Sequence, residues 1–178
     1  MNRNRLVSRT FRVPQESLKR LDAEAKNRDV SVNSLLNQIL TKYLTFDLFG
    51  EKANPVVIAE ATLLAMIDRL SPEQMEQAGN IAGSKVLSSL FAHYSIKPTL
   101  DSVLEYYIRP MSKYSGWFSA KYHEEEQKIA LHHTFGLKWS YFLKGHVGAS
   151  IRSVLKIEPK IEISESSVVI YLRNQTIK

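Results

Sequence analysis

The chain has 178 residues, of which 44% are hydrophobic and 24% are charged, and its formal net charge is +6. These proportions are those of an average soluble globular chain, so they exclude a largely disordered protein. The absence of cysteine excludes disulfides, thiolate zinc sites and thiol nucleophiles, and no apolar run approaches the roughly 20 residues of a membrane span.

Positive charge is concentrated at the beginning of the chain. Residues 1–44 hold nine Lys or Arg and four acidic residues, whereas the remaining 134 residues hold fifteen basic and fourteen acidic ones. This distribution is expected if the first segment alone faces a polyanion. The first basic residues are not followed by the apolar run and cleavage site of a signal peptide, so we expect a cytoplasmic protein.

A short strand is predicted over residues 6–13, because Phe11 and Val13 alternate with polar residues. Pro14 ends this strand and suits the start of a helix. The polar face of the predicted strand carries Ser8, Thr10 and Arg12.

Two amphipathic helices are expected next. The first spans residues 15–28 and has a narrow apolar stripe, and the second follows Ser31, a good N-cap, and stays apolar on one face to Leu44. A strand and two helices in about 44 residues cannot enclose a core of their own. We therefore expect a homodimer, with interlocked helices and with the two strands paired antiparallel into a ribbon.

The same residues carry a family resemblance. They are Thr10-Phe11-Arg12-Val13-Pro14, Leu18-Lys19-Arg20-Leu21, Asn27-Arg28-Asp29-Val30 and Ser31-Val32-Asn33-Ser34-Leu35-Leu36. Together they resemble the ribbon-helix-helix DNA-binding regulators of the Arc and MetJ type over about residues 5–45. The resemblance implies that the ribbon enters the major groove of double-stranded DNA, and that bases are contacted by Ser8, Thr10 and Arg12.

The chemistry of these side chains suits that role. The guanidinium of Arg12 can bond two acceptors of guanine at once, and short hydroxyls can bond several base edges. The free N–H groups at the start of the second helix predict a phosphate clamp formed by Ser31, Val32 and Asn33. Further phosphate contacts are expected from Arg3, Arg5 and Arg9.

Two alternatives stay open for this module. Arg9 falls on the inward side of the predicted strand, where family members often have an apolar residue, so either the register is shifted or Arg9 turns toward phosphate. The strand and helices could also be a dimerisation element without a role in DNA binding.

The rest of the chain predicts a linker and a second domain. Residues 46–55, with Gly50 and Pro55, form the linker between a DNA-binding module over residues 1–45 and a dimerisation or effector domain over residues 56–178. Helices are expected over residues 58–70, over 71–94 after a capping box, and from Thr99 until Pro110 bends or ends the last one.

An antiparallel ββαββ arrangement is predicted after these helices. Its strands are residues 117–123, 129–135, 160–163 and 168–173, and its helix is residues 137–155. The predicted fold class is therefore α+β, with an N-terminal βαα module followed by a helical segment and this C-terminal sheet.

Nothing in the second domain predicts an enzyme, a cofactor or a metal site. His132 and His133 are adjacent on a strand and point to opposite faces, although His123 could lie across the hairpin from one of them. Three adjacent glutamates, residues 124–126, are expected in a solvated turn rather than in acid–base catalysis. Gly145 and Gly148 match no phosphate loop and are expected to let the helix approach a neighbour.

The second domain also contains a group of aromatic residues and a segment with a further resemblance. Trp117, Trp139, Tyr141 and Phe142 are expected in the core, with an apolar ligand pocket as the alternative. The segment over residues 132–142 is similar to C-terminal domains of some archaeal-type regulators.

The sequence thus predicts a homodimeric, sequence-specific transcriptional regulator, either a repressor or an activator. Its C-terminal domain would serve oligomerisation and could bind a small-molecule effector. One alternative is an antitoxin-type protein that binds a cognate partner, although such tails are usually short and flexible. Another is a DNA partition or architectural protein, which would show a small specificity ratio.

Overall fold

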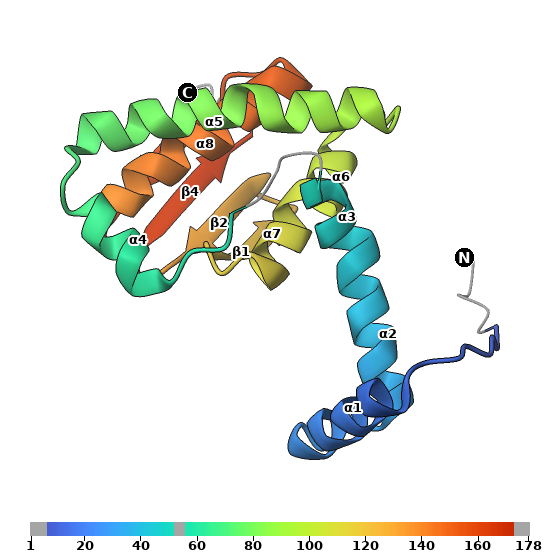
Figure 1. Ribbon diagram of the computed structural model, residues 1–178. Helices are drawn as coiled ribbons and strands as arrows, with labels where there is room; N and C mark the ends of the chain where they lie inside the picture. The colour runs from blue at the N-terminus through green and yellow to red at the C-terminus, as the bar shows by residue number, and fades with distance from the viewer. Residues whose placement is uncertain (1–6, 52–55, 173–178) are drawn as a thin grey trace. The chain divides into compact units, whose positions relative to one another are not determined.

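In the computed structural model, which describes residues 7–51 and 56–172, helices come first and a four-stranded sheet lies in the last third of the chain (Figure 1). Contacts between residues divide the chain after Tyr43 into two units, residues 1–43 and 44–178.

The first unit contains two packed helices, α1 (Gln15–Asn27) and α2 (Val32–Lys42). Helix α1 starts directly after Pro14, whose fixed φ of −56° leads into the first turn. Asp29, with a φ of 53°, sits in the turn that separates the helices. The two helices meet through their apolar sides, where Ala25 and Leu35 are the buried residues of these elements.

The predicted βαα start is wrong. Residues 7–14 form neither a strand nor a helix, and α1 is the first regular element of the described chain. Alternating side chains suit an extended backbone, but a strand also needs a neighbouring strand to share its hydrogen bonds. In the part of the chain that the structure describes, all strand pairing occurs within the sheet of the second unit. The ribbon-helix-helix fold predicted for residues 1–45 is therefore corrected to a helical unit with an extended arm.

The second unit begins with helical turns where a linker was expected. A π-helical segment η1 (Tyr43–Asp47) leads into α3 (Leu48–Gly50), and α4 (Glu60–Ile67) and α5 (Pro72–His93) follow. The start of α5 has the predicted capping box, in which the Ser71 side chain accepts from the Gln74 N–H and the Gln74 side chain accepts from the Ser71 N–H.

Pro110 neither ends nor breaks the helix in which it lies. The helix runs through α6 (Leu100–Val103), η3 (Leu104–Ile108) and α7 (Arg109–Tyr114). Proline has no N–H to donate, and the widened π-helical turn of η3 directly precedes it. We attribute the continuation of the helix to this local widening.

The sheet contains β1 (Ser119–His123), β2 (Lys128–His132), β3 (Lys160–Ile163) and β4 (Ser167–Tyr171) in the antiparallel order β1-β2-β4-β3. The predicted ββαββ arrangement fits it only loosely, since β1 starts at residue 119 rather than 117 and β2 ends at residue 132 rather than 135. The early end of β2 follows from Gly136, which has a φ of 78° and caps the next helix, α8 (Leu137–Leu155).

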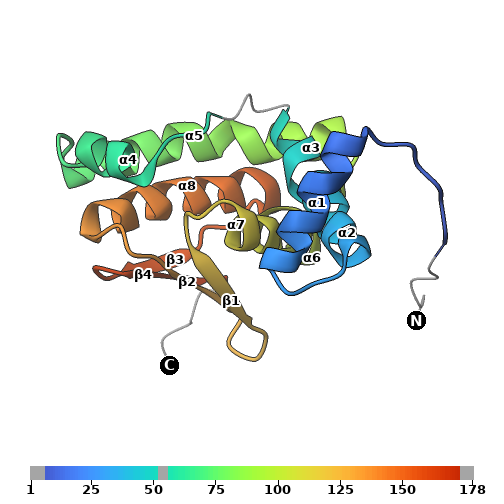
Figure 2. The ribbon, with the colours of Figure 1, turned by 60° about the horizontal axis from the view of Figure 1, so that its bottom comes forward.

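Helix α5, helix α8 and the sheet form three successive layers of the second unit (Figure 2). The inner face of the sheet is fully apolar at its centre, with Ile129 and Leu131 of β2 beside Val168 and Ile170 of β4, all at 0% exposure. Because α8 lies between the sheet and α5, it is buried on both sides. It supplies fully buried Leu143, Val147 and Ile151 to the core.

Helices α5 and α8 cross unusually closely, because glycines face backbone atoms at the crossing. A Cβ on Gly79 would collide with the carbonyl oxygen of Phe142, and one on Gly83 would collide with that of His146. On the opposite helix, α8, a Cβ on Gly145 would collide with the carbonyl oxygen of Glu76 in α5. The prediction that Gly145 allows close approach is confirmed.

None of the helices in the described part of the chain combines the length and the hydrophobicity that crossing a membrane requires.

Candidate nucleic-acid interface

The extended arm before α1 presents the residues predicted to contact bases. Ser8, Thr10 and Arg12 are all exposed, and so is Arg9. Within the described residues, neither arginine has an acidic partner, so both guanidinium groups are available to an external anion. The other two predicted phosphate contacts, Arg3 and Arg5, lie outside the described residues.

The start of α2 forms a capped helix N-terminus. Ser31 adopts the extended conformation of an N-cap, and its hydroxyl accepts a hydrogen bond of 3.1 Å from the Ser34 N–H. The N–H groups of Val32 and Asn33 precede the first intrahelical donors, so they have no partner within the helix. Val32 is half-buried and Asn33 is exposed. These groups can bind a phosphate oxygen, which the helix dipole also favours.

Helix α1 adds positive charge that the sequence analysis did not single out. Arg20 pairs with Glu16 at 3.5 Å, and Arg28 pairs with Glu24 one turn away. Lys19 and Lys26 of the same helix are exposed and have no acidic partner in the described chain. The signal was present in the sequence, because i,i+4 spacing identifies which arginines are neutralised locally.

Large apolar side chains of the first unit are also exposed. Phe11 is 74% exposed, Ile39 is 47% exposed and Leu40 is 50% exposed, while Ala25 and Leu35 are the buried apolar residues of α1 and α2. Two buried side chains cannot offset the conformational entropy lost when about 40 residues become ordered. This unit therefore needs a further apolar surface to pack against.

The histidines of the second unit have structural roles or lie at the surface. His133 is buried, and its Nε2 lies 2.8 Å from the hydroxyl of Ser140, which itself donates to the carbonyl of Ser164. Nε2 must therefore carry the proton and donate, while Nδ1 accepts from the Phe135 N–H. Burial, followed by the nearby charge of His132, lowers the pKa of His133 and keeps it neutral.

The hairpin register places His123 far from both His132 and His133, so the alternative of a metal site across the hairpin is not supported. In the β1–β2 pairing, His132 is opposite Ser119, and His123 is opposite Lys128 at the other end of the hairpin. Among residues 7–51 and 56–172, no three His, Asp or Glu side chains are grouped as a metal site would require.

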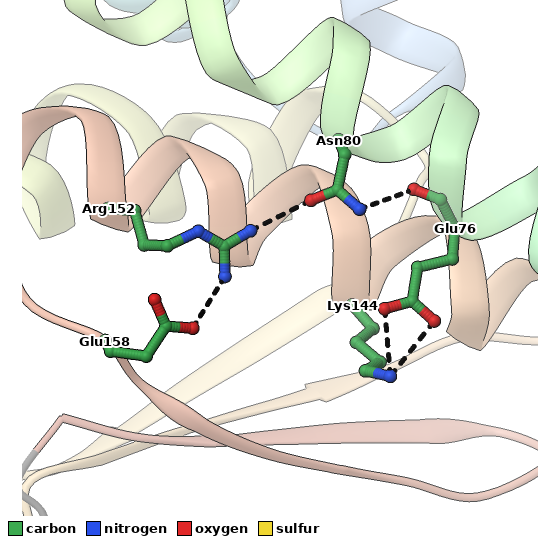
Figure 3. Close-up of polar contacts among 5 residues, drawn as sticks. All are labelled: Glu76, Asn80, Lys144, Arg152 and Glu158. Atoms are coloured by element: carbon green, nitrogen blue, oxygen red, sulfur yellow. Dashed lines mark hydrogen bonds and ion pairs between the residues drawn. The ribbon is translucent and has the colours of Figure 1, made fainter.

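Polar side chains connect α5 with α8 along one side of their crossing (Figure 3). Lys144 pairs with Glu76 at 2.9 Å, and Arg152 donates hydrogen bonds of 2.9 Å to both Asn80 and Glu158. Each of these charges thus has a partner from another element. The arrangement orients α5 on α8 rather than preparing a group for catalysis.

The aromatic residues of the second unit form a packed cluster. Trp139 is 3% exposed, stacks on Phe142 at 4.6 Å and donates a hydrogen bond of 3.0 Å to the carbonyl of Trp117. Trp117 in turn contacts His146 edge-on at 5.3 Å. Trp139 is therefore a core residue, whereas Trp117, Tyr141 and Phe142 are partly buried and pack against the core.

Comparison with protein-family models, with curated proteins and with solved structures finds no match for this chain. The functional assignment therefore depends on the chemistry of the residues described above.

Proposed function

We propose that this chain is a sequence-specific DNA-binding transcriptional regulator that acts in the cytoplasm as a homodimer. The observation that supports this most is the coincidence, in one small helical unit, of exposed unpaired cations, a capped helix N-terminus with two N–H groups left for a ligand, and exposed apolar side chains. Cations and helix N-termini bind phosphates, and the apolar surface fits a second copy of the same unit.

Within this proposal, the extended arm reads the bases and the helices hold the backbone. Arg12 can form two hydrogen bonds with guanine, whereas Ser8 and Thr10 suit several base edges. Lys19 and Lys26, being long and exposed, would contact phosphates and carry no sequence information. The arm is placed immediately before the rigid helix α1, which limits where Arg12 can reach.

The self-association in this proposal follows from the energetics of the first unit. The exposed Phe11, Ile39 and Leu40 would become buried against the same residues of a second copy, since a two-fold dimer pairs identical surfaces. Full burial of an exposed side chain of this kind is worth roughly 1.5–3 kcal/mol, and the half-exposed Ile39 and Leu40 would each gain about half of that. This gain compensates for the small core inside each copy.

The first prediction concerns base reading by Arg12. A DNA sequence selected from a random pool by the full chain should bind Arg12→Ala about 5- to 150-fold more weakly, the equivalent of about 1–3 kcal/mol for one bidentate contact. Affinity for random DNA should fall much less. The measurement is a binding titration on both DNAs at two salt concentrations, because phosphate contacts weaken steeply with salt.

Two control variants separate base reading from charge. Lys26→Ala should weaken binding to selected and random DNA by the same factor and reduce the salt slope by about one. Lys121→Ala, in β1 of the second unit, should leave both unchanged. If the full chain selects no sequence, or if Arg12→Ala discriminates as well as wild type, Arg12 does not read bases. A small specificity ratio would instead favour an architectural or partition protein.

The second prediction concerns the dimer. The full chain should sediment as a dimer at micromolar concentration, and Ile39→Glu should shift it toward monomer because a charge would be buried without a partner. Gln77→Glu, which adds the same charge to an exposed position of α5, serves as the control and should leave the dimer intact. A stable wild-type monomer at this concentration would refute the dimer.

A further inference from the structure

A hollow on the second unit lies where the C-terminal ends of α5 and α8 come together. It is shallow and open to solvent, with a volume of about 490 Å³. Phe91 and Val154 line it and are themselves 5% and 6% exposed, while Ile96 and Pro98 of the following loop add further apolar surface. The hollow is therefore mostly apolar and large enough for a ring or a short alkyl chain.

The charged residues that line this hollow are all positive. Lys97 and Lys156 contribute to its wall, and no Asp or Glu does. Ser95 also lines it, and its hydroxyl has no hydrogen-bond partner within the described residues. The ammonium of Lys156 donates one hydrogen bond of 2.8 Å to the carbonyl of Ser153, which also lines the hollow, and its other two N–H groups remain for a ligand. An apolar surface with two ammonium groups and an exposed hydroxyl is complementary to an amphipathic anion.

Two helix C-termini point toward the hollow, and their dipoles oppose an anion. Much of this effect is neutralised locally, because the last carbonyls of α5 accept hydrogen bonds from the N–H groups of Tyr94, Ser95 and Ile96. The Lys156 N–H does the same for the carbonyl of Arg152 in α8. Half a charge at each helix end is smaller than the full charge of each lysine, so the net field favours a negative ligand.

Two non-glycine residues at this hollow adopt a backbone conformation that is unfavourable for any residue with a side chain. Ser95 and Lys156 have φ values of 52° and 57°, in the left-handed region that a helix C-terminus normally fills with glycine. These are two of the four non-glycine residues with positive φ in the described chain. A side chain retained at a position where glycine is more stable suggests a use for that side chain.

We infer that this hollow binds a small carboxylic acid with an apolar body, its carboxylate held by Lys97, Lys156 and Ser95. The apolar part of the ligand lies on Ile96 and Pro98, beside the nearly buried Phe91 and Val154. The site is independent of the proposed DNA binding, and either can fail without the other. A ligand here would contact the ends of both long helices at once.

The test uses 4-phenylbutyrate and its neutral amide, 4-phenylbutanamide, as probes of the full chain. In a two-dimensional amide NMR titration, 4-phenylbutyrate should shift signals of residues 91–98 and 153–156. The amide, which keeps the ring but lacks the charge, should bind about fivefold more weakly, as expected from the loss of exposed ion pairs. Equal affinity of the two probes, or no shift at 10 mM, overturns the inference.

A variant that removes the charge without harming the fold makes this test decisive. Lys156→Gly deletes one ammonium group and relieves the left-handed backbone, so its melting temperature should rise by about 2–4 °C while its affinity for 4-phenylbutyrate falls about threefold. Lys121→Gln, which removes the same charge from β1, should bind the probe as wild type does. If Lys156→Gly binds as wild type does, or if the shifts map to other residues, the site is refuted.

Discussion

Replacing Gly83 with alanine should destabilise the second unit by about 2–4 kcal/mol. Alanine is better than glycine inside a helix by about 1 kcal/mol, so an isolated α5 would gain stability from this change. At the crossing with α8, however, the new Cβ would overlap the carbonyl oxygen of His146. Neither backbone can move without separating the two helices that make up the core, so the steric cost exceeds the gain.

Urea unfolding followed by circular dichroism measures this difference. Ser84→Ala is the matched control, because Ser84 is the next residue of the same helix, is exposed and bonds only to the carbonyl of Ile81. Its stability should stay within about 0.5 kcal/mol of wild type. A Gly83→Ala variant that is as stable as wild type would show that α5 and α8 do not cross this closely.

Helix ends that are fixed by a nearby capping residue can be predicted from the local sequence. Ser71 and Gln74 mark the start of α5 through a capping box, and Ser31 marks the start of α2 as an N-cap. Gly136 separates β2 from α8 because it can adopt a positive φ. In each case the determining interaction lies within a few residues, so a short window of sequence contains it.

Features that depend on distant residues were not predictable. The alternation over residues 6–13 was interpreted as a strand, but whether such a segment becomes a strand depends on a neighbour that a local pattern does not reveal. Likewise, nothing near Pro110 indicates that the preceding turn widens to let the helix continue. The order β1-β2-β4-β3 and the pairing of Lys144 with Glu76 depend on how the elements pack in space.

The candidate sites also include features that follow from local sequence and features that depend on distant residues. Ser8, Thr10 and Arg12 are exposed together with every other residue of 7–14, because this segment has no partner strand in the described chain, whereas the cap at Ser31 follows from its local sequence. The pairing of Arg28 with Glu24 also follows from local sequence, because the i,i+4 spacing brings these residues together once the helix over residues 15–28 is predicted. The hollow at the ends of α5 and α8 joins residues about 60 positions apart and has no sequence signature.

Acid should destabilise the second unit well before its carboxylates are protonated, because His146 is buried in a neutral site. Burial lowers the pKa of His146 from an ordinary value of 6.5 to about 4. Its Nδ1 shares a hydrogen bond of 2.7 Å with the hydroxyl of Tyr107, and the rings of Trp117 and Phe142 surround it. None of these neighbours carries a charge that would stabilise an imidazolium.

The linkage between proton binding and folding gives the direction of the change in stability and its pH range. Between pH 6.5 and 4 the unfolded chain binds a proton at His146 that the folded chain does not, so the free energy of unfolding falls as the pH is lowered. The loss should be about 2 kcal/mol between pH 7 and pH 5, and should reach about 3 kcal/mol below pH 4. His133, whose pKa is also lowered by burial, adds to the loss in the same direction.

Urea unfolding at pH 7 and pH 5 measures the change, and His146→Gln should reduce it because glutamine does not titrate. If that variant does not fold, the imidazole proton signals of wild type give the pKa of His146 directly. A His146 that titrates near 6.5 would mean that the imidazole is in contact with water. The aromatic cluster around it would then not be the closed core that joins α8 to η3.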